Sequence, residues 1–288
     1  ERQQKDGSYA IDMSYPSYVP FMDFSESGEA RKNLKYKFNN RATDTNLEIL
    51  NNIIRKRREL VSVLDYNTYA EYRTEDRMAK NPQNVWEFEN DLRNKLRPKG
   101  EMDIAEMLKI KSKRTATEAT TIDVWEAGYY ENLVLKENFD LDPEEVRQYF
   151  EFNNVTAGLF TVYQRLFNVT FKKVSNPSVW HEDVLMYEVY DGSSNELIGR
   201  FYLDMFPRAN KYGHAAAFSV TMGKMTPDGY QKPATALVCN FPKPTEFQPS
   251  LLTHDNVETY FHEFGHLVHG VLTQAQLMSY AGTSVPRD

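Results

Sequence analysis

The residues His262-Glu263-Phe264-Gly265-His266 predict more about the fold and chemistry of this chain than any other stretch. On an α-helix, four residues at about 100° each bring the second imidazole to within roughly 40° of the first. His262 and His266 can therefore bind one metal ion together, and Glu263 can face a water molecule held by that metal. The pattern predicts a zinc hydrolase site carried by a helix.

The residues before and after the motif favour this helix. Thr253 is a suitable N-cap, and Asp255 and Glu258 place negative charge in the early turns. Glu258 also lies four residues before His262, where it can accept the ring N–H of a metal-binding histidine; an exposed helix carboxylate is the equally favoured alternative. Apolar side chains recur at helical spacing at Val257, Phe261, Phe264, Val268 and Val271.

A catalytic zinc site normally uses three protein ligands, so the two histidines need a partner. The metzincin pattern requires a glycine at position 269 and a histidine at 272, where this chain has His269 and Leu272. His269 lies about a turn beyond His266, where it is better placed to orient the site than to bind the metal. Asp288 is the one carboxylate after the motif, and ligation by Asp288 is a less favoured alternative.

Composition limits the classes of protein to which the chain can belong. Its 288 residues suffice for one large domain or two, and 41% are hydrophobic, without the long apolar run that a membrane span needs. A net charge of -7 argues against a nucleic acid partner, and we interpret the basic run at 55–58 as a solvated helix face. The single cysteine, Cys239, lies in an apolar run that favours burial, and it fits a reducing compartment. We expect a monomer in the cytoplasm, with an organelle or the periplasm as alternatives.

Helical apolar spacing dominates the first two thirds of the chain. It predicts helices over 29–39, 45–64, 69–79, 85–96, 102–113 and 143–167. Short β-rich segments separated by turn sequences follow over 184–190, 196–203 and 235–241. The sequence thus predicts a mainly α fold with a small β-sheet, in which 1–175 form a helical region and 176–288 a catalytic region.

A run of small residues precedes the motif. Gly213, Ala215 and Ala216 would let a peptide backbone approach closely, and Tyr212 and His214 are further candidates to contact it. Such a segment can pair with a peptide substrate as an added β-strand. Tight packing of the same segment against helices is the alternative, and the two interpretations do not exclude each other.

Longer stretches carry a family resemblance. The runs FYLDMFPR at 201–208, KYGHAAAF at 211–218 and LLTHDNVETYFHEFGH at 251–266 resemble the M3 zinc metallopeptidases, the group of thimet oligopeptidase, neurolysin and saccharolysin. The resemblance implies a two-lobed helical gluzincin fold with a deep channel that admits short peptide substrates, and residues 1–175 would form the wall of that channel. It also implies one Zn²⁺ per active site, with His262 and His266 as ligands and Glu263 as general base.

The resemblance also suggests where the third ligand lies. In the family this ligand is a Glu in an Asp-Phe-Val-Glu segment, and Asp288 corresponds to the Asp of that segment, which puts the Glu about three residues further on. We therefore expect the chain to be the middle of a longer oligopeptidase, truncated before its third zinc ligand. A metal-free helical peptide-binding fragment, or an inactive partial peptidase, is the alternative function.

Overall fold

A computed structural model describes residues 4–286 and 288, and its internal contacts divide them into two units. The first unit comprises the described residues up to Ser17 together with Leu141–Pro286, and the second comprises Tyr18–Asp140 with Asp288. The helix that ends at Phe167 is followed at once by the first strand, and the division of the chain at residue 175 stays a prediction. About half of the chain is helical, and the predicted mainly α fold with a small sheet is confirmed.

The second unit is helical. Its helices are α2 to α6, with most of α1, and their bounds are Tyr15–Phe24 (α1), Gly28–Asn39 (α2), Thr43–Val63 (α3), Tyr69–Thr74 (α4), Pro82–Thr115 (α5) and Ala127–Phe139 (α6). The side chains of Ser27, Thr68 and Asn81 cap α2, α4 and α5 by accepting backbone N–H bonds. Arg55 to Arg58 are exposed on α3, as the sequence predicts.

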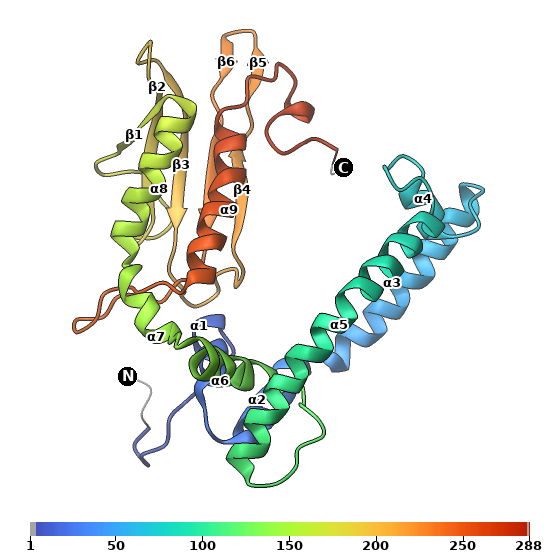
Figure 1. Cartoon of the computed structure of the whole chain (residues 1–288). Helices are drawn as coiled ribbons and strands as arrows, with labels where there is room; N and C mark the ends of the chain where they lie inside the picture. Colours follow the sequence, from blue (N-terminus) through green and yellow to red (C-terminus); the bar gives the residue numbers. More distant parts are fainter. Residues whose placement is uncertain (1–3, 287) are drawn as a thin grey trace. The chain divides into compact units, whose positions relative to one another are not determined.

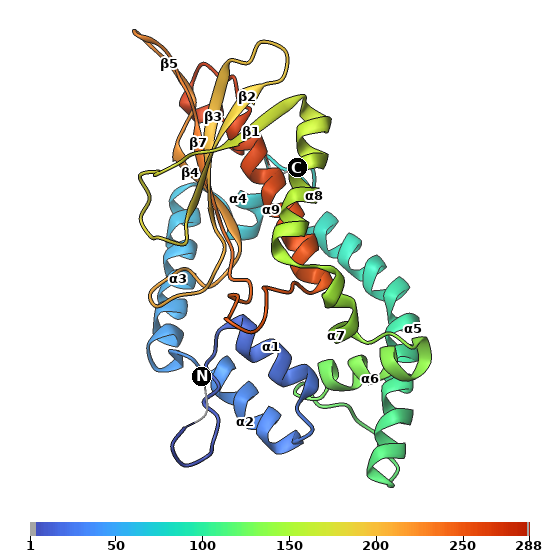
Figure 2. The same ribbon diagram turned by 90° about the vertical axis from the view of Figure 1, so that its left-hand side faces the viewer.

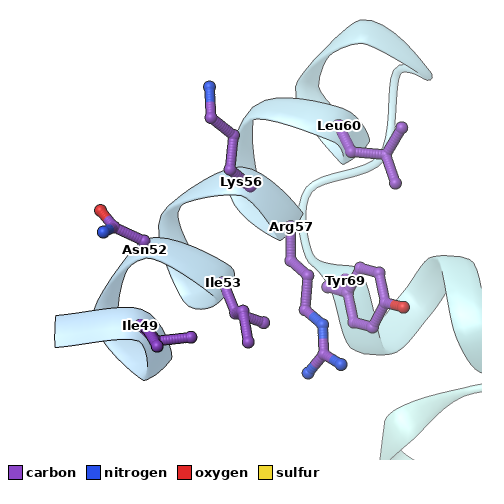
Figure 3. Close-up of a pocket in the computed structure, with 7 residues that line it drawn as sticks. All are labelled: Ile49, Asn52, Ile53, Lys56, Arg57, Leu60 and Tyr69. Atoms are coloured by element: carbon purple, nitrogen blue, oxygen red, sulfur yellow. The ribbon is translucent and has the colours of Figure 1, made fainter. Parts of the chain in front are cut away.

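Figure 3 shows a shallow groove of about 400 Å³ on α3 and α4. Ile49, Ile53 and Leu60 contribute apolar surface, and the Arg57 guanidinium lies 4.9 Å from the centre of the Tyr69 ring. The groove belongs to the second unit alone and contains none of the motif residues.

The prediction of two separate helices over 85–96 and 102–113 is wrong, because α5 runs through Pro98 as one helix of 34 residues. A proline inside a helix costs about 3 kcal/mol through a lost hydrogen bond and a steric clash. Here Pro98 is exposed, and good helix formers on both sides of it, such as Leu96, Glu101 and Met102, continue the same helical turns. Helix propensity summed over the long flanking segments outweighs the local cost.

The first unit is built on a five-stranded sheet with the order β1-β2-β3-β7-β4. Its strands are Val169–Lys173 (β1), Leu185–Asp191 (β2), Leu197–Asp204 (β3), Ala216–Thr221 (β4) and Ala234–Val238 (β7). The pair β3 and β7 is parallel and the other pairs are antiparallel, which leaves β4 at one edge with a partner on one side only. Lys224–Thr226 (β5) and Gly229–Gln231 (β6) form a separate hairpin.

The helix expected over 143–167 is interrupted. The structure has Pro143–Val146 (α7), a 3-10 turn at Arg147–Tyr149 and Phe152–Phe167 (α8). The backbone between them pairs with the segment at 250–252. Phe152 N–H donates to the Ser250 carbonyl, and Leu252 N–H donates to the Phe150 carbonyl. Long-range pairing therefore replaces one helical turn.

Helices α8 and α9 (His254–Val271) cover one face of this sheet (Figures 1 and 2). The Thr253 side chain caps α9 in a reciprocal pair with Asn256, so the predicted N-cap is confirmed. Tyr260, Phe264 and Leu267 of α9 are fully buried and pack in one core cluster with sheet and α8 side chains such as Phe201, Leu203, Leu237 and Leu159. The core therefore fixes the rotation of α9 about its own axis.

Candidate active site

The rotation of α9 presents the two motif histidines outward. The faces with Phe264 and Leu267 are buried, whereas His262 and His266 are exposed, with their Nε2 atoms 3.2 Å apart and their rings at 82° to each other. A zinc ion placed 2.0–2.1 Å from both nitrogens would make an angle of about 100° between them, close to the tetrahedral value. The distance between the two nitrogens therefore suits a zinc ion that both histidines bind.

Glu263 follows His262 on α9 and is half-buried. Helix α9 packs on β7 and β4, and Cys239 directly follows β7. Burial raises the pKa of the Cys239 thiol to about 12, and the negative charge of Glu263 contributes to the same rise. Glu263 thus lies on the sheet side of the histidine pair, and the predicted burial of Cys239 is confirmed.

Two other candidate ligands have contacts of their own. His269 is exposed and lines a hollow of about 590 Å³ beside α8, with Tyr163, Val268 and Leu272 among its neighbours. Asp288 belongs to the second unit, where its carboxylate accepts the Met78 N–H at 2.8 Å and pairs with Arg77 at 3.6 Å. Its role as a zinc ligand stays a prediction.

Glu258 lies in a small exposed cluster at the start of α9. Its carboxylate and the side chains of His254 and Asp255 offer donor atoms within 4.8 Å of one another. Within residues 4–286 and 288, this is the one set of three such groups close enough to share an ion, and it contains neither motif histidine. Support of His262 by Glu258 stays a prediction.

The run of small residues forms the approach to the edge strand. Ala215 packs against the core below α9, and Ala216 begins β4, where it pairs with Val238 of β7. Tyr212 and His214 are exposed in the preceding loop, where the Tyr212 ring contacts those of His214 and Phe218. One long edge of β4 therefore packs into the sheet and the other has no strand beside it among the described residues.

The loop before β4 contains part of a buried charged network, formed by Asp204, Arg208 and Lys211, that the sequence analysis does not predict. Asp204, at the end of β3, is 2% exposed and accepts two bonds from Arg208, at 2.6 and 2.8 Å, and one from the Trp180 indole at 2.8 Å. The Lys211 ammonium lies 2.9 Å from the same carboxylate. Burial raises the pKa of Asp204, but the hydrogen bonds from Arg208, Lys211 and Trp180 outweigh it and lower that pKa to about 2.

Two histidines and a glutamate on a helix, packed against a sheet with an open edge, define the metallopeptidase class of site. Comparison with known proteins identifies the family. The profile of peptidase family M3 matches residues 21–288, and this chain belongs to that family.

Curated relatives agree with the family profile. The chain is 36% identical to a thimet-like oligopeptidase of Dictyostelium discoideum, over 99% of the chain and 44% of the relative. It is 36% identical to saccharolysin of Saccharomyces cerevisiae, over 100% of the chain and 42% of the relative. It is 34% identical to oligopeptidase A of Escherichia coli, over 97% of the chain and 42% of the relative. The chain therefore spans less than half the length of these relatives.

Proposed function

We propose that this chain is part of a zinc-dependent metalloendopeptidase that hydrolyses short peptides. The observation that carries the proposal is the pair of exposed Nε2 atoms 3.2 Å apart on α9, with Glu263 beside them. Membership of the M3 family and the oligopeptidase names of its relatives support peptides as the substrate class. A gluzincin architecture with two lobes and a channel, a monomeric state and a cytoplasmic location stay predictions.

The roles of the residues follow from their chemistry. His262 and His266 would hold the metal through Nε2, which requires both rings to be neutral at those atoms. Zinc, when bound, supplies a Lewis acid that polarises a carbonyl and makes a water more acidic. The Glu263 carboxylate would take a proton from the attacking water and return it to the leaving amine.

The edge strand β4 would bind the peptide. An edge strand presents unpaired backbone N–H and C=O groups that a peptide in extended conformation can use. Because Ala215 and Ala216 have small side chains, the backbone of a substrate can approach this edge closely. Helix α9 packs against the same strand, which would bring the bound peptide next to the motif.

The test is cleavage of a fluorescence-quenched peptide of about ten residues by the full-length protein. Replacing Glu263→Gln removes the base but keeps the size of the side chain, so we expect kcat to fall at least about 100-fold. The control is Glu196→Gln, an exposed carboxylate in the turn before β3, which should leave kcat unchanged. A Glu263→Gln enzyme with a kcat close to that of the unmodified protein would refute the proposed role.

Within residues 4–286 and 288, no helix has the length and apolar character needed to span a membrane.

A further inference from the structure

We propose that Asn240 and the network of Asp204, Arg208 and Lys211 are positioning residues for the peptide-binding edge of β4. The inference rests on the proposed function, because it concerns how the same peptide is bound. It is carried by a set of hydrogen bonds that converge on the loop at 205–215, which connects β3 to β4.

Lys211 is the centre of these bonds. Its side chain is 3% exposed, and its ammonium donates to the backbone carbonyls of Asp204, Phe206 and Cys239 at 2.9, 2.7 and 2.6 Å. These carbonyls come from the end of β3, the loop after it and the residue after β7. One cation thus joins the ends of two neighbouring strands to the start of the loop.

Asn240 holds the part of the same loop that would face the substrate. Its side-chain amide donates to the carbonyls of Tyr212 and His214, at 2.8 and 3.3 Å. Because Cys239 is held by Lys211 and is the neighbour of Asn240, the donor of these two bonds is itself anchored. The backbone directions of the loop are therefore set by side chains that do not reach the motif.

The burial of charge in the network supports a positioning role. A buried ion pair gains little stability over a well-packed apolar core, because desolvation of both charges offsets their attraction. Charged and hydrogen-bonded groups do specify one geometry, since each donor must meet its acceptor. A network of this kind is therefore better suited to fix the loop at 205–215 than to strengthen the fold.

The experiment replaces Asn240→Asp in the full-length protein. Aspartate has nearly the same volume but lacks the amide donors, so the two bonds to the loop are lost. We expect KM for a short peptide to rise about 5-fold or more while kcat changes less than 2-fold. The matched control is Asn84→Asp, because the Asn84 amide also donates to a backbone carbonyl, that of Ala79, outside the first unit. KM of this control should not change.

Direct binding separates this inference from the proposed function. In the Glu263→Gln background, the dissociation constant of the same peptide should rise by the same factor when Asn240→Asp is added. If the unmodified protein cleaves the peptide but Asn240→Asp leaves both KM and the dissociation constant within 2-fold, the positioning role is wrong. If the unmodified protein cleaves no peptide, the proposed function fails, and the dissociation constant alone then tests the positioning role.

Discussion

Replacement of Asp204→Asn should destabilise the first unit by about 3–5 kcal/mol, because it leaves a buried ammonium and a guanidinium without their anionic partner. The carboxylate accepts from Arg208 at 2.6 and 2.8 Å and from Trp180 at 2.8 Å, and the Lys211 ammonium lies 2.9 Å from it. The side-chain amide of Asn would retain one oxygen and would place its own N–H groups against cationic donors. For a unit of this size the loss corresponds to a fall in Tm of roughly 6–20 °C.

The assay is urea unfolding followed by circular dichroism, with Glu188→Gln as the matched control. Glu188 pairs with Arg200 across β2 and β3, but both side chains are partly exposed, so that pair contributes less than about 1 kcal/mol. A fall in the free energy of unfolding for Asp204→Asn no larger than that for Glu188→Gln would refute the reasoning.

The pH dependence of the free energy of unfolding provides a second check. Because the pKa of Asp204 is lowered from 3.8 to about 2 in the folded protein, its contribution is complete above about pH 4 and is lost as pH falls toward 2, by about 2 kcal/mol.

Two further predictions concern the packing of the same unit. Gly270→Ala should lower the free energy of unfolding in urea by about 1–3 kcal/mol, because a Cβ at this position would lie 2.7 Å from the Thr235 hydroxyl. The control is Gly158→Ala in α8, which has open space around it and should be neutral or stabilising. Equal changes in the free energy of unfolding for the two variants would contradict this prediction. The Cys239 thiol should react with a disulfide reagent at neutral pH only at the rate of unfolding, because burial raises its pKa to about 12; rapid labelling of the native protein would contradict this.

Helix α9 is the element that the sequence predicts best, because its determinants are local. The N-cap at Thr253, the apolar spacing and the motif itself lie within 20 residues, and the structure has the helix at His254–Val271. The sequence analysis does not predict helix α1, which contains Pro20. The sequence also fails to predict that α5 continues through Pro98, because the flanking helix outweighs a strong local signal for a turn.

The parts of the site that the sequence analysis misses depend on distant contacts. Nothing local indicates that Lys211 is buried, since its acceptors include the carbonyl of Cys239, 28 residues away. Arg208 pairs with Asp204. The place of β4 at the sheet edge follows from the parallel pairing of β3 with β7, which brings together strands far apart in the chain. A charged residue at the end of an apolar strand, with a cation four residues later, is the one sequence signal for such a network.

The zinc content of the full-length protein after dialysis against metal-free buffer decides whether the motif histidines bind the metal, and it is measured for three forms: unmodified, His262→Ala and Glu263→Gln. We expect about one zinc per chain in the unmodified and Glu263→Gln proteins and loss of zinc in His262→Ala, because a catalytic site binds its metal through the histidines and not through the base. Retention of one zinc by a folded His262→Ala protein, or no zinc in an unmodified protein that cleaves peptides, would contradict it.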